Sequence, residues 1–183
     1  MEVTRLRALR GPNLWSHHTA IQAIVSCNAA EHAVDKIDGF EVRLRARFPE
    51  IGSFQPTGQD NSIAMVHVLE LAALGLQAQA GCPVTFSCTT PTVDADVYQL
   101  VVEYSEEAVG RLAMDLAQTL CQSALDDTPF DLTAALTQLR DLDEDVRLGP
   151  STGCIVDAAV ARNIPYSRMT EGSMVRFGWG SKQ

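Results

Sequence analysis

Short runs of apolar residues have the length and composition of β-strands. Residues 3–10 are rich in Arg and Leu and lead into Gly11-Pro12-Asn13, a cluster that interrupts regular structure. Residues 20–26, which read AIQAIVS, are mostly apolar and β-branched. Residues 84–90 and 97–104 are two further runs of this kind, separated by a proline and a polar turn. The pattern predicts four strands, and the last two can pair as antiparallel neighbours.

Elsewhere the apolar residues recur with the period of a helix. Residues 61–80 carry the clearest apolar stripe, with Gly81 as a stop signal. Residues 106–124 carry a second long stripe, and a shorter helix is predicted over residues 132–142. Another short helix, ended by a proline, is predicted by three aromatic or aliphatic residues spaced four apart, namely Phe40, Leu44 and Phe48.

Polar residues predict where the two long helices begin. Asn61 or Ser62 can cap the first of them, because their side chains accept hydrogen bonds from unpaired backbone N–H groups. Ser105 precedes Glu106 and Glu107 at the start of the second. A hydroxyl followed by acids suits the partial positive charge of a helix N-terminus.

The composition changes at residues 148–151, which read LGPS, and we place a domain boundary there. Beyond it, the pattern predicts a helix capped by Ser151 or Thr152 and a β-hairpin between residues 165 and 177. This segment stops in mid-pattern and is too short to bury its own apolar faces. We therefore expect it to be the front edge of a further domain.

The chain has 183 residues, of which 46% are hydrophobic, and this is enough to build one core. The order of the elements predicts an α+β fold with a mixed or antiparallel sheet covered by helices on one side. We expect residues 1–147 to form this domain. Residues 148–183 are expected to be a linker and the truncated start of a further domain.

Acidic residues outnumber basic ones, with 23 Asp and Glu against 14 Lys and Arg and a net charge of −9. This balance disfavours nucleic acid as a partner, because cationic side chains that neutralise phosphates supply most of that affinity. The acids gather between residues 126 and 145, where Arg140 is the single Lys or Arg. Such a run is typical of a solvated face, and binding of a cationic ligand is the alternative interpretation.

The five cysteines are odd in number, widely spaced and without a CxxC pair, which favours reduced thiols. The chain has no pattern of a signal peptide and no apolar run near the roughly 18 residues that cross a bilayer. These features predict a cytoplasmic protein without a membrane partner.

The sequence offers no complete catalytic or metal-binding pattern. It contains no GxxxxGK[ST] loop to hold phosphates. His17 and His18 are adjacent, so they point apart on a strand, and no second pair of metal ligands follows nearby. Cys88 has no evident base and is interpreted as an inert buried thiol. We expect no catalysis, cofactor or metal from this chain alone.

Four segments form a distinctive ordered set along nearly the whole chain. They are residues 9–16 (LRGPNLWS), 68–77 (VLELAALGLQ), 97–111 (VYQLVVEYSEEAVGR) and 148–152 (LGPST), the last followed by IP and FGWG. They resemble the cyanophycin synthetases, which polymerise aspartate and arginine into a storage polymer. The corresponding family segments read LRGPNxWS, VxEHVALELQ, VYQVVxEY…VGR and LGPST…GIP…LGYG, and the last passage leads into the family's ATP-grasp domain.

The resemblance implies an N-terminal domain that tethers the growing polymer in a larger enzyme. An ATP-grasp domain would add aspartate and a Mur ligase-like domain would add arginine, with ATP and Mg at sites outside these residues. A polymer that carries guanidinium and carboxylate groups needs acids and bases for pairing. The candidate substrate-binding residues are Glu70, Glu103, Glu106, Glu107 and Arg111.

The chain also departs from the family pattern. Leu71 and Gly75 stand where the family helix has His and a second Glu, and residues 86–90 read FSCTT where the family often has FGRTR. Several groups that could pair with the polymer are therefore missing, and the surviving acids favour contacts to arginine side chains.

Each candidate also has a structural interpretation. Glu70 can simply face solvent, and acids such as Glu106 and Glu107 stabilise the first turn of a helix in any protein. Arg10 and the turn that follows it are better explained as structure, with the arginine packed against Trp15 or an acid.

Two functions follow from these considerations. The first is a non-catalytic module that tethers the aspartate/arginine polymer on its acidic surface. The second is a purely structural domain that packs against its ATP-grasp neighbour or against a sister subunit of a homo-oligomer and binds no ligand.

Overall fold

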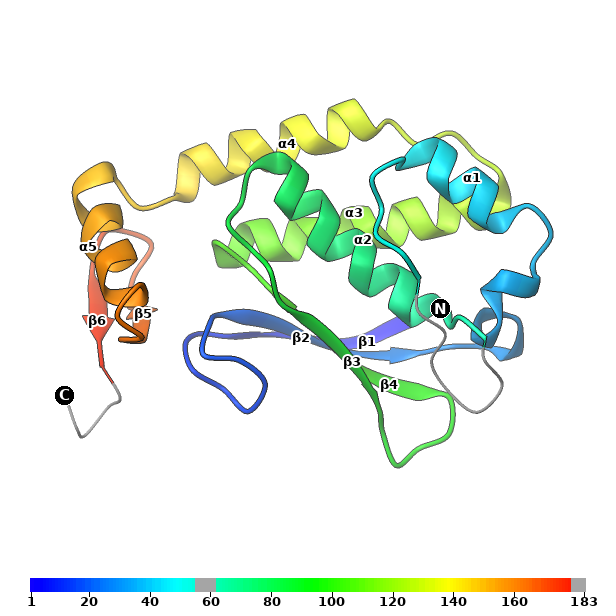
Figure 1. Cartoon of the computed structure of the whole chain (residues 1–183), viewed down its shortest axis with the longest axis horizontal. Coiled ribbons are helices and arrows are strands. Elements are labelled where there is room, and N and C mark those ends of the chain that lie inside the picture. Colours follow the sequence, from blue (N-terminus) through cyan, green and yellow to red (C-terminus); the bar gives the residue numbers. More distant parts are fainter. Residues whose placement is uncertain (55–61, 179–183) are drawn as a thin grey trace.

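The computed structural model describes residues 1–54 and 62–178 of the chain. Four strands form the main sheet in the order β1-β2-β4-β3, and every neighbouring pair is antiparallel (Figure 1). The strands are β1 Glu2–Leu9, β2 Ala20–Ser26, β3 Ser87–Pro91 and β4 Val97–Glu103. The prediction that the last two strands pair as antiparallel neighbours is confirmed.

The helices follow the predicted order. The connection after β2 contains two short 3-10 helices, η1 Ala29–His32 and η2 Val34–Lys36. The α-helices are α1 Phe40–Arg47, α2 Met65–Ala80, α3 Glu107–Asp126, α4 Leu132–Val146 and α5 Pro150–Val160. A small hairpin, β5 Tyr166–Arg168 and β6 Val175–Phe177, closes the described part of the chain.

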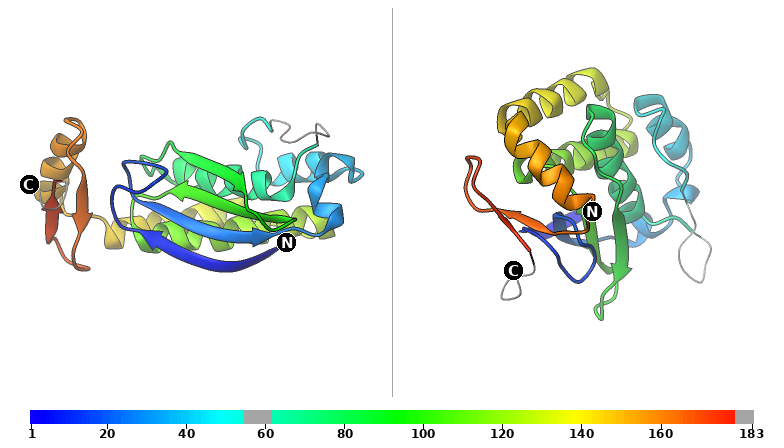
Figure 2. Two further views of the ribbon diagram at one scale, coloured as in Figure 1. Left: turned by 90° about the horizontal axis from the view of Figure 1, so that it is seen from below. Right: turned by 60° about the vertical axis from the view of Figure 1, so that its left-hand side comes forward.

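Helices α1 to α4 lie on one face of the main sheet, which is the α+β arrangement that the pattern predicts (Figure 2). Helices α2 and α3 contact the strands directly, and α1 and α4 pack outside them. Among the described elements, no helix covers the opposite face of the sheet. The sheet therefore has one face buried under helices, whereas the opposite face carries exposed side chains such as Arg5 as well as buried ones such as Gln22 and Val101.

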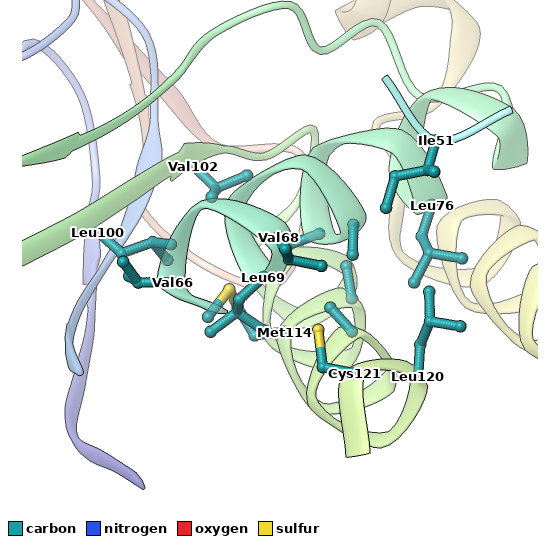
Figure 3. Close-up of a cluster of buried hydrophobic side chains, with 14 of the residues drawn as sticks. Ile51, Val66, Val68, Leu69, Leu76, Leu100, Val102, Met114, Leu120 and Cys121 are labelled. Carbon is teal, nitrogen blue, oxygen red and sulfur yellow. The ribbon is translucent and has the colours of Figure 1, made fainter. Parts of the chain in front are cut away.

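Strand alternation sorts side chains between these two faces. Ile21, Ala23 and Val25 point toward the helices and are at most 1% exposed, whereas Gln22 and Ile24 between them point the other way. The helices contribute an apolar stripe at the 3.6-residue period, and Figure 3 shows this packing between α2, β4 and α3. Those core residues include Val66, Leu69, Leu100, Val102, Met114 and Leu120.

Helix α2 begins at Met65, so the prediction that Ser62 caps it is wrong; Asn61 lies outside the described residues. The N-cap is Ala64, which has no side chain that could accept a hydrogen bond. The preceding residue is held by tertiary contacts, since the Ile63 N–H donates to the Asp35 carboxylate and Val34 N–H donates to the Ile63 carbonyl. These contacts keep the chain out of the helix until Met65. The predicted stop at Gly81 is confirmed by its left-handed conformation, with φ of 100°.

Two other predicted caps are also wrong. The N-cap of α3 is Glu106. The Ser105 hydroxyl donates a hydrogen bond of 3.0 Å to the Asp143 carboxylate of α4. The N-cap of α5 is Gly149, and Pro150 occupies the first turn, where its missing N–H is not needed. Ser151 and Thr152 are therefore inside the helix. The second long helix and the α5 helix themselves are confirmed, and α4 extends past the predicted end to Val146.

Residues 148–178 contain helix α5 and the β5–β6 hairpin, which lie beside the main sheet (Figure 1). Helix α5 contacts β5, and the predicted β-hairpin is confirmed by a backbone hydrogen bond from Met169 to Met174. In the described part of the chain, no helix combines the length and apolar character needed to cross a membrane.

Candidate functional site

The junction of β4 and α3 brings together four of the five candidate residues. Glu103 ends β4, Glu106 is the N-cap of α3, and Glu107 is the first residue of that helix. Arg111 follows Glu107 by four positions, and residues at this spacing lie on the same face of a helix. The turn from strand to helix thus concentrates three carboxylates and one guanidinium near the end of the sheet.

Glu107 lies between two arginines, and we call Arg10, Glu107 and Arg111 the surface triad. One carboxylate oxygen accepts from Arg10 Nε at 2.7 Å, and the other accepts from Arg111 at 2.9 and 3.0 Å. The hydrogen bond from Arg10 and then that from Arg111 lower the pKa of Glu107 despite its partial burial. The side chains of Arg10, Glu107 and Arg111 are 69%, 27% and 44% exposed. The interpretation of Arg10 as a residue that packs against an acid is confirmed.

Glu103 is held inside the fold. One of its carboxylate oxygens accepts hydrogen bonds from the backbone N–H groups of Thr85 and Phe86, both at 2.8 Å, and the other lies 3.8 Å from His18 Nδ1. Its side chain is 8% exposed. Because Glu103 binds the backbone of residues 85 and 86, strand pairing of β3 starts at Ser87 and not at residue 84 as predicted.

Glu106 connects the start of α3 to the β5–β6 hairpin. Its carboxylate lies 2.6 Å from Arg168 Nη1, and both side chains are largely buried. Burial raises the pKa of Glu106, and the Arg168 guanidinium opposes that shift. Arg168 also donates a hydrogen bond of 2.6 Å to the carbonyl of Val146 at the end of α4. The ion pair therefore connects three elements that are distant in sequence.

Glu70 lies apart from the β4–α3 junction, between α2 and β3. Its carboxylate accepts from the Ser87 hydroxyl at 2.7 Å and lies 3.6 Å from His67 Nδ1. Burial by itself raises the pKa of this carboxyl, but the interactions with His67, Thr89 and Ser87 outweigh burial, and the pKa of Glu70 is lowered. Glu70 thus faces the edge strand and not open solvent.

At the two α2 positions where the family has His and Glu, this chain has residues that pack against apolar side chains. A Cβ added at Gly75 would lie 3.0 Å from the ring of Phe48, so this aromatic side chain fills the space that a larger residue would need. Leu71 packs against the core beside Gly52. Both positions therefore lie in apolar contacts between α2 and the segment that follows α1, where a polar side chain would be unfavourable.

The loop between β1 and β2 is fixed by Asn13. The Asn13 side-chain oxygen accepts from the N–H groups of Trp15 and Ser16, and its amide nitrogen donates to the carbonyls of Gly11 and His18. Gly11 has φ of 133°, a conformation that favours glycine. The LRGPNLWS segment is therefore a structured loop, and its beginning places Arg10 beside Glu107.

The structure also contains a hollow that the predicted elements did not indicate. It has a volume of about 480 Å³, lies on the helix-free face of the sheet, and we call it the sheet groove. Its lining comes from β1, β2, β4 and the loop between β1 and β2, and includes Arg5, Arg7, Trp15, Gln22 and Gln99. The alternation of Arg5, Leu6, Arg7 and Ala8 already carried the signal that both arginines share one face.

Within the described residues, no group of three or more His, Cys, Asp and Glu is placed to hold a metal ion. His18 contacts Glu103, and burial followed by the nearby Glu70 raises the pKa of the Cys88 thiol. A raised pKa disfavours the thiolate that a nucleophile needs.

Residues 22–126, from β2 to the end of α3, match the family model described as the cyanophycin synthase-like N-terminal domain. The chain belongs to this family. It is 33% identical to a cyanophycin synthetase of Trichormus variabilis over 98% of its length and 34% identical to that of Geminocystis herdmanii over 100%. A cyanophycin synthetase of a Synechocystis species is 33% identical over 100% of the chain.

The chain spans about a fifth of the length of these relatives, 22% to 23% of each. The matched family region contains Glu70, Glu103, Glu106, Glu107 and Arg111, together with Gln22 and Gln99 of the sheet groove. The cyanophycin synthase-like domain thus includes β2, β4, α2 and α3, the elements that position all five candidates.

Proposed function

We propose that this domain tethers an aspartate/arginine polymer within a larger ATP-dependent ligase and performs no chemistry itself. Three observations support the proposal: the family of the domain, the name cyanophycin synthetase borne by the relatives, and the surface triad. Tethering would raise the local concentration of a polymer end near catalytic domains without any new catalytic group.

The surface triad is the observation that carries this proposal. The polymer contains guanidinium and carboxylate groups, and the triad presents one carboxylate between two exposed guanidiniums. A polymer guanidinium can exchange with Arg10 or Arg111 on Glu107, while the released arginine binds a polymer carboxylate. Such an exchange retains charge pairing throughout.

The other candidate acids would have supporting roles in this proposal. Glu70, Glu103 and Glu106 are each held by internal hydrogen bonds or ion pairs. We propose that Glu103 and Glu106 position the β4–α3 junction and that Glu70 holds the edge strand β3. Glu107 and Arg111 contact the polymer.

Catalysis would come from other parts of the parent enzyme. We propose that residues 148–183 are the linker and the start of an ATP-grasp-like domain, which would use ATP and Mg to add aspartate, with a Mur ligase-like domain for arginine. The domain itself would then need neither nucleotide nor metal.

Substitution of Glu107 tests the proposed contact. Titration of the purified chain with short aspartate/arginine polymer is expected to give salt-dependent binding, and Glu107→Gln is expected to weaken it by about three- to tenfold, since one exposed charged contact is lost. Glu41→Gln is the matched control, because Glu41 also pairs with an arginine four positions later in its helix, Arg45. Equal affinity of Glu107→Gln and the wild type would exclude the triad as the contact.

A structural role is the second candidate function, and the Arg168 contacts favour it. Arg168 binds Glu106 and the Val146 carbonyl, so the hairpin rests on the end of α4 and the start of α3. We propose that this ion pair sets the position of the domain that follows. A purely structural domain would give no signal in the polymer titration.

Arg168→Gln is expected to release the hairpin without unfolding the main domain. Hydrogen exchange of residues 165–178 should become faster by about tenfold or more, because an uncompensated Glu106 remains in a largely buried position. The control is Arg162→Gln, since the Arg162 side chain donates a hydrogen bond to the Ala158 carbonyl of the preceding helix α5. Unchanged exchange in Arg168→Gln would show that other contacts hold the hairpin.

A further inference from the structure

The sheet groove concentrates positive charge on an acidic chain. Arg5 pairs with Ile24 and Arg7 pairs with Gln22 across the β1–β2 ladder, so both arginines stand on the helix-free face. They are two residues apart on one strand, which separates their Cα atoms by about 7 Å. The described residues that line the groove include no Asp or Glu, although the chain has a net charge of −9.

Neither arginine of the groove is neutralised within the described chain. Arg10, Arg111 and Arg168 all form ion pairs with carboxylates, whereas Arg5 and Arg7 form none. Arg7 Nε donates to the side-chain oxygen of Gln22, a buried amide at the floor of the groove. This bond orients the Arg7 guanidinium and leaves its terminal nitrogens as donors.

The opposite wall of the groove is apolar. Leu14 is 97% exposed, and Trp15 beside it also lines the hollow. A large apolar side chain so fully exposed next to two cations is not explained by packing of the fold. Because Asn13 fixes this loop through four hydrogen bonds, the wall is formed before any ligand arrives.

We infer that the sheet groove binds the carboxylates of an extended aspartate-containing polymer chain. Arg5 and Arg7 pair with successive carboxylates, and the Gln99 amide bonds polymer amides. The buried Gln22 amide orients Arg7, and Leu14 and Trp15 contact the polymer methylenes. Charge complementarity selects this occupant, since the described lining of the groove offers two cations and no acid. The inference rests on the proposed polymer-tethering function and adds a second carboxylate-binding surface to it.

The groove is continuous with the surface triad along β1. Leu9 lines the groove, and the next residue, Arg10, binds Glu107. Arg5 and Arg7 lie on β1, and Arg10 follows directly after the last residue of this strand. A polymer chain of a few residues can contact both, with its carboxylates on the arginines and a guanidinium on Glu107.

The double variant Arg5→Gln/Arg7→Gln tests the assignment. In a Trp179→Phe background, Trp15 is the single tryptophan, so its fluorescence reports a ligand in the groove. Titrations use poly-L-aspartate, which lacks guanidinium, and the aspartate/arginine polymer. We expect the double variant to bind both about tenfold or more weakly and to lose the Trp15 response to poly-L-aspartate. Arg162→Gln/Arg176→Gln removes the same charge elsewhere and should bind like the wild type.

The possible results separate this inference from the proposed function. If the wild type binds the polymer and the double variant binds it equally well, the groove assignment is wrong and the tethering function stands. If the wild type binds poly-L-aspartate through Arg5 and Arg7 but not the aspartate/arginine polymer, the tethering function is wrong and the carboxylate site stands.

Two other occupants would overturn the assignment. An oligonucleotide of equal charge that binds as tightly as poly-L-aspartate would identify a general anion site. Sedimentation that shows a dimer dissociated by the double variant would identify the groove as an interface between two copies. Thermal unfolding of the double variant should match that of the wild type, since Arg5 and Arg7 are exposed.

Discussion

Gly110→Ala is expected to lower the free energy of unfolding by about 3 kcal/mol, because overpacking forces backbone shifts in a well-packed core. Gly110 lies on α3 where the helix crosses the sheet. An added Cβ would lie 2.6 Å from Tyr104 Cβ and 3.0 Å from Ile21 Cγ1. Since Tyr104 Cβ is attached to the backbone, relief requires α3 to move away from the strands. Urea denaturation followed by circular dichroism measures the effect.

Gly153→Ala provides the control for this experiment. Gly153 is inside α5, and the nearest atom to an added Cβ is the Leu148 carbonyl oxygen at 3.8 Å. Alanine has the higher helix propensity, so this variant should be as stable as the wild type or slightly more stable. Equal stability of both variants would mean that α3 does not depend on a close approach at Gly110.

Glu103→Leu is expected to lower the free energy of unfolding by about 2 to 3 kcal/mol, because hydrogen bonds to a charged group are lost and the N–H groups lose their partner. The carboxylate accepts from the N–H groups of Thr85 and Phe86. Glu103→Gln keeps one oxygen as acceptor and should have an intermediate effect. Thermal unfolding and hydrogen exchange of residues 85–91 measure both variants.

The same variants distinguish a structural from a ligand-binding role of Glu103. If Glu103→Leu retains full stability but loses polymer binding, Glu103 belongs to the binding surface and not to the support of β3. The matched variant at the triad, Glu107→Gln, is expected to show the opposite behaviour, with weaker binding and little change in stability. The pair therefore assigns separate roles to two acids that are four residues apart in the chain.

The sequence and the structure agree best where a pattern is local. Residues 20–26 form the predicted strand because their β-branched, apolar composition suits a sheet in which alternate side chains are buried. The stripe beginning at Val109 places α3, and Gly81 ends α2 through its left-handed conformation. These features depend on residues within a few positions of each other.

Agreement fails where a distant residue competes for the same backbone group. Ser105 is a residue type that often caps helices. Its hydroxyl instead donates a hydrogen bond to Asp143 of α4, and α3 begins after Glu106. Residues 84–86 have strand composition, but Glu103 binds two of their N–H groups. In both cases a carboxylate distant in sequence forms the hydrogen bond that a local pattern assigns to a neighbour.

The sequence alone determined the α+β class, the order of the elements, the family resemblance and the set of charged residues that could bind a polymer. Tertiary structure decided which of those charges are used internally: Glu103, Glu106 and Glu70 bind backbone or neighbouring side chains, while Glu107 and Arg111 remain partly exposed. It also brought Arg5 and Arg7 together with Trp15 in the sheet groove. The physical reason is that residue spacing dictates which side chains share a strand or helix face, whereas burial and ion pairing depend on segments that meet only when the chain folds.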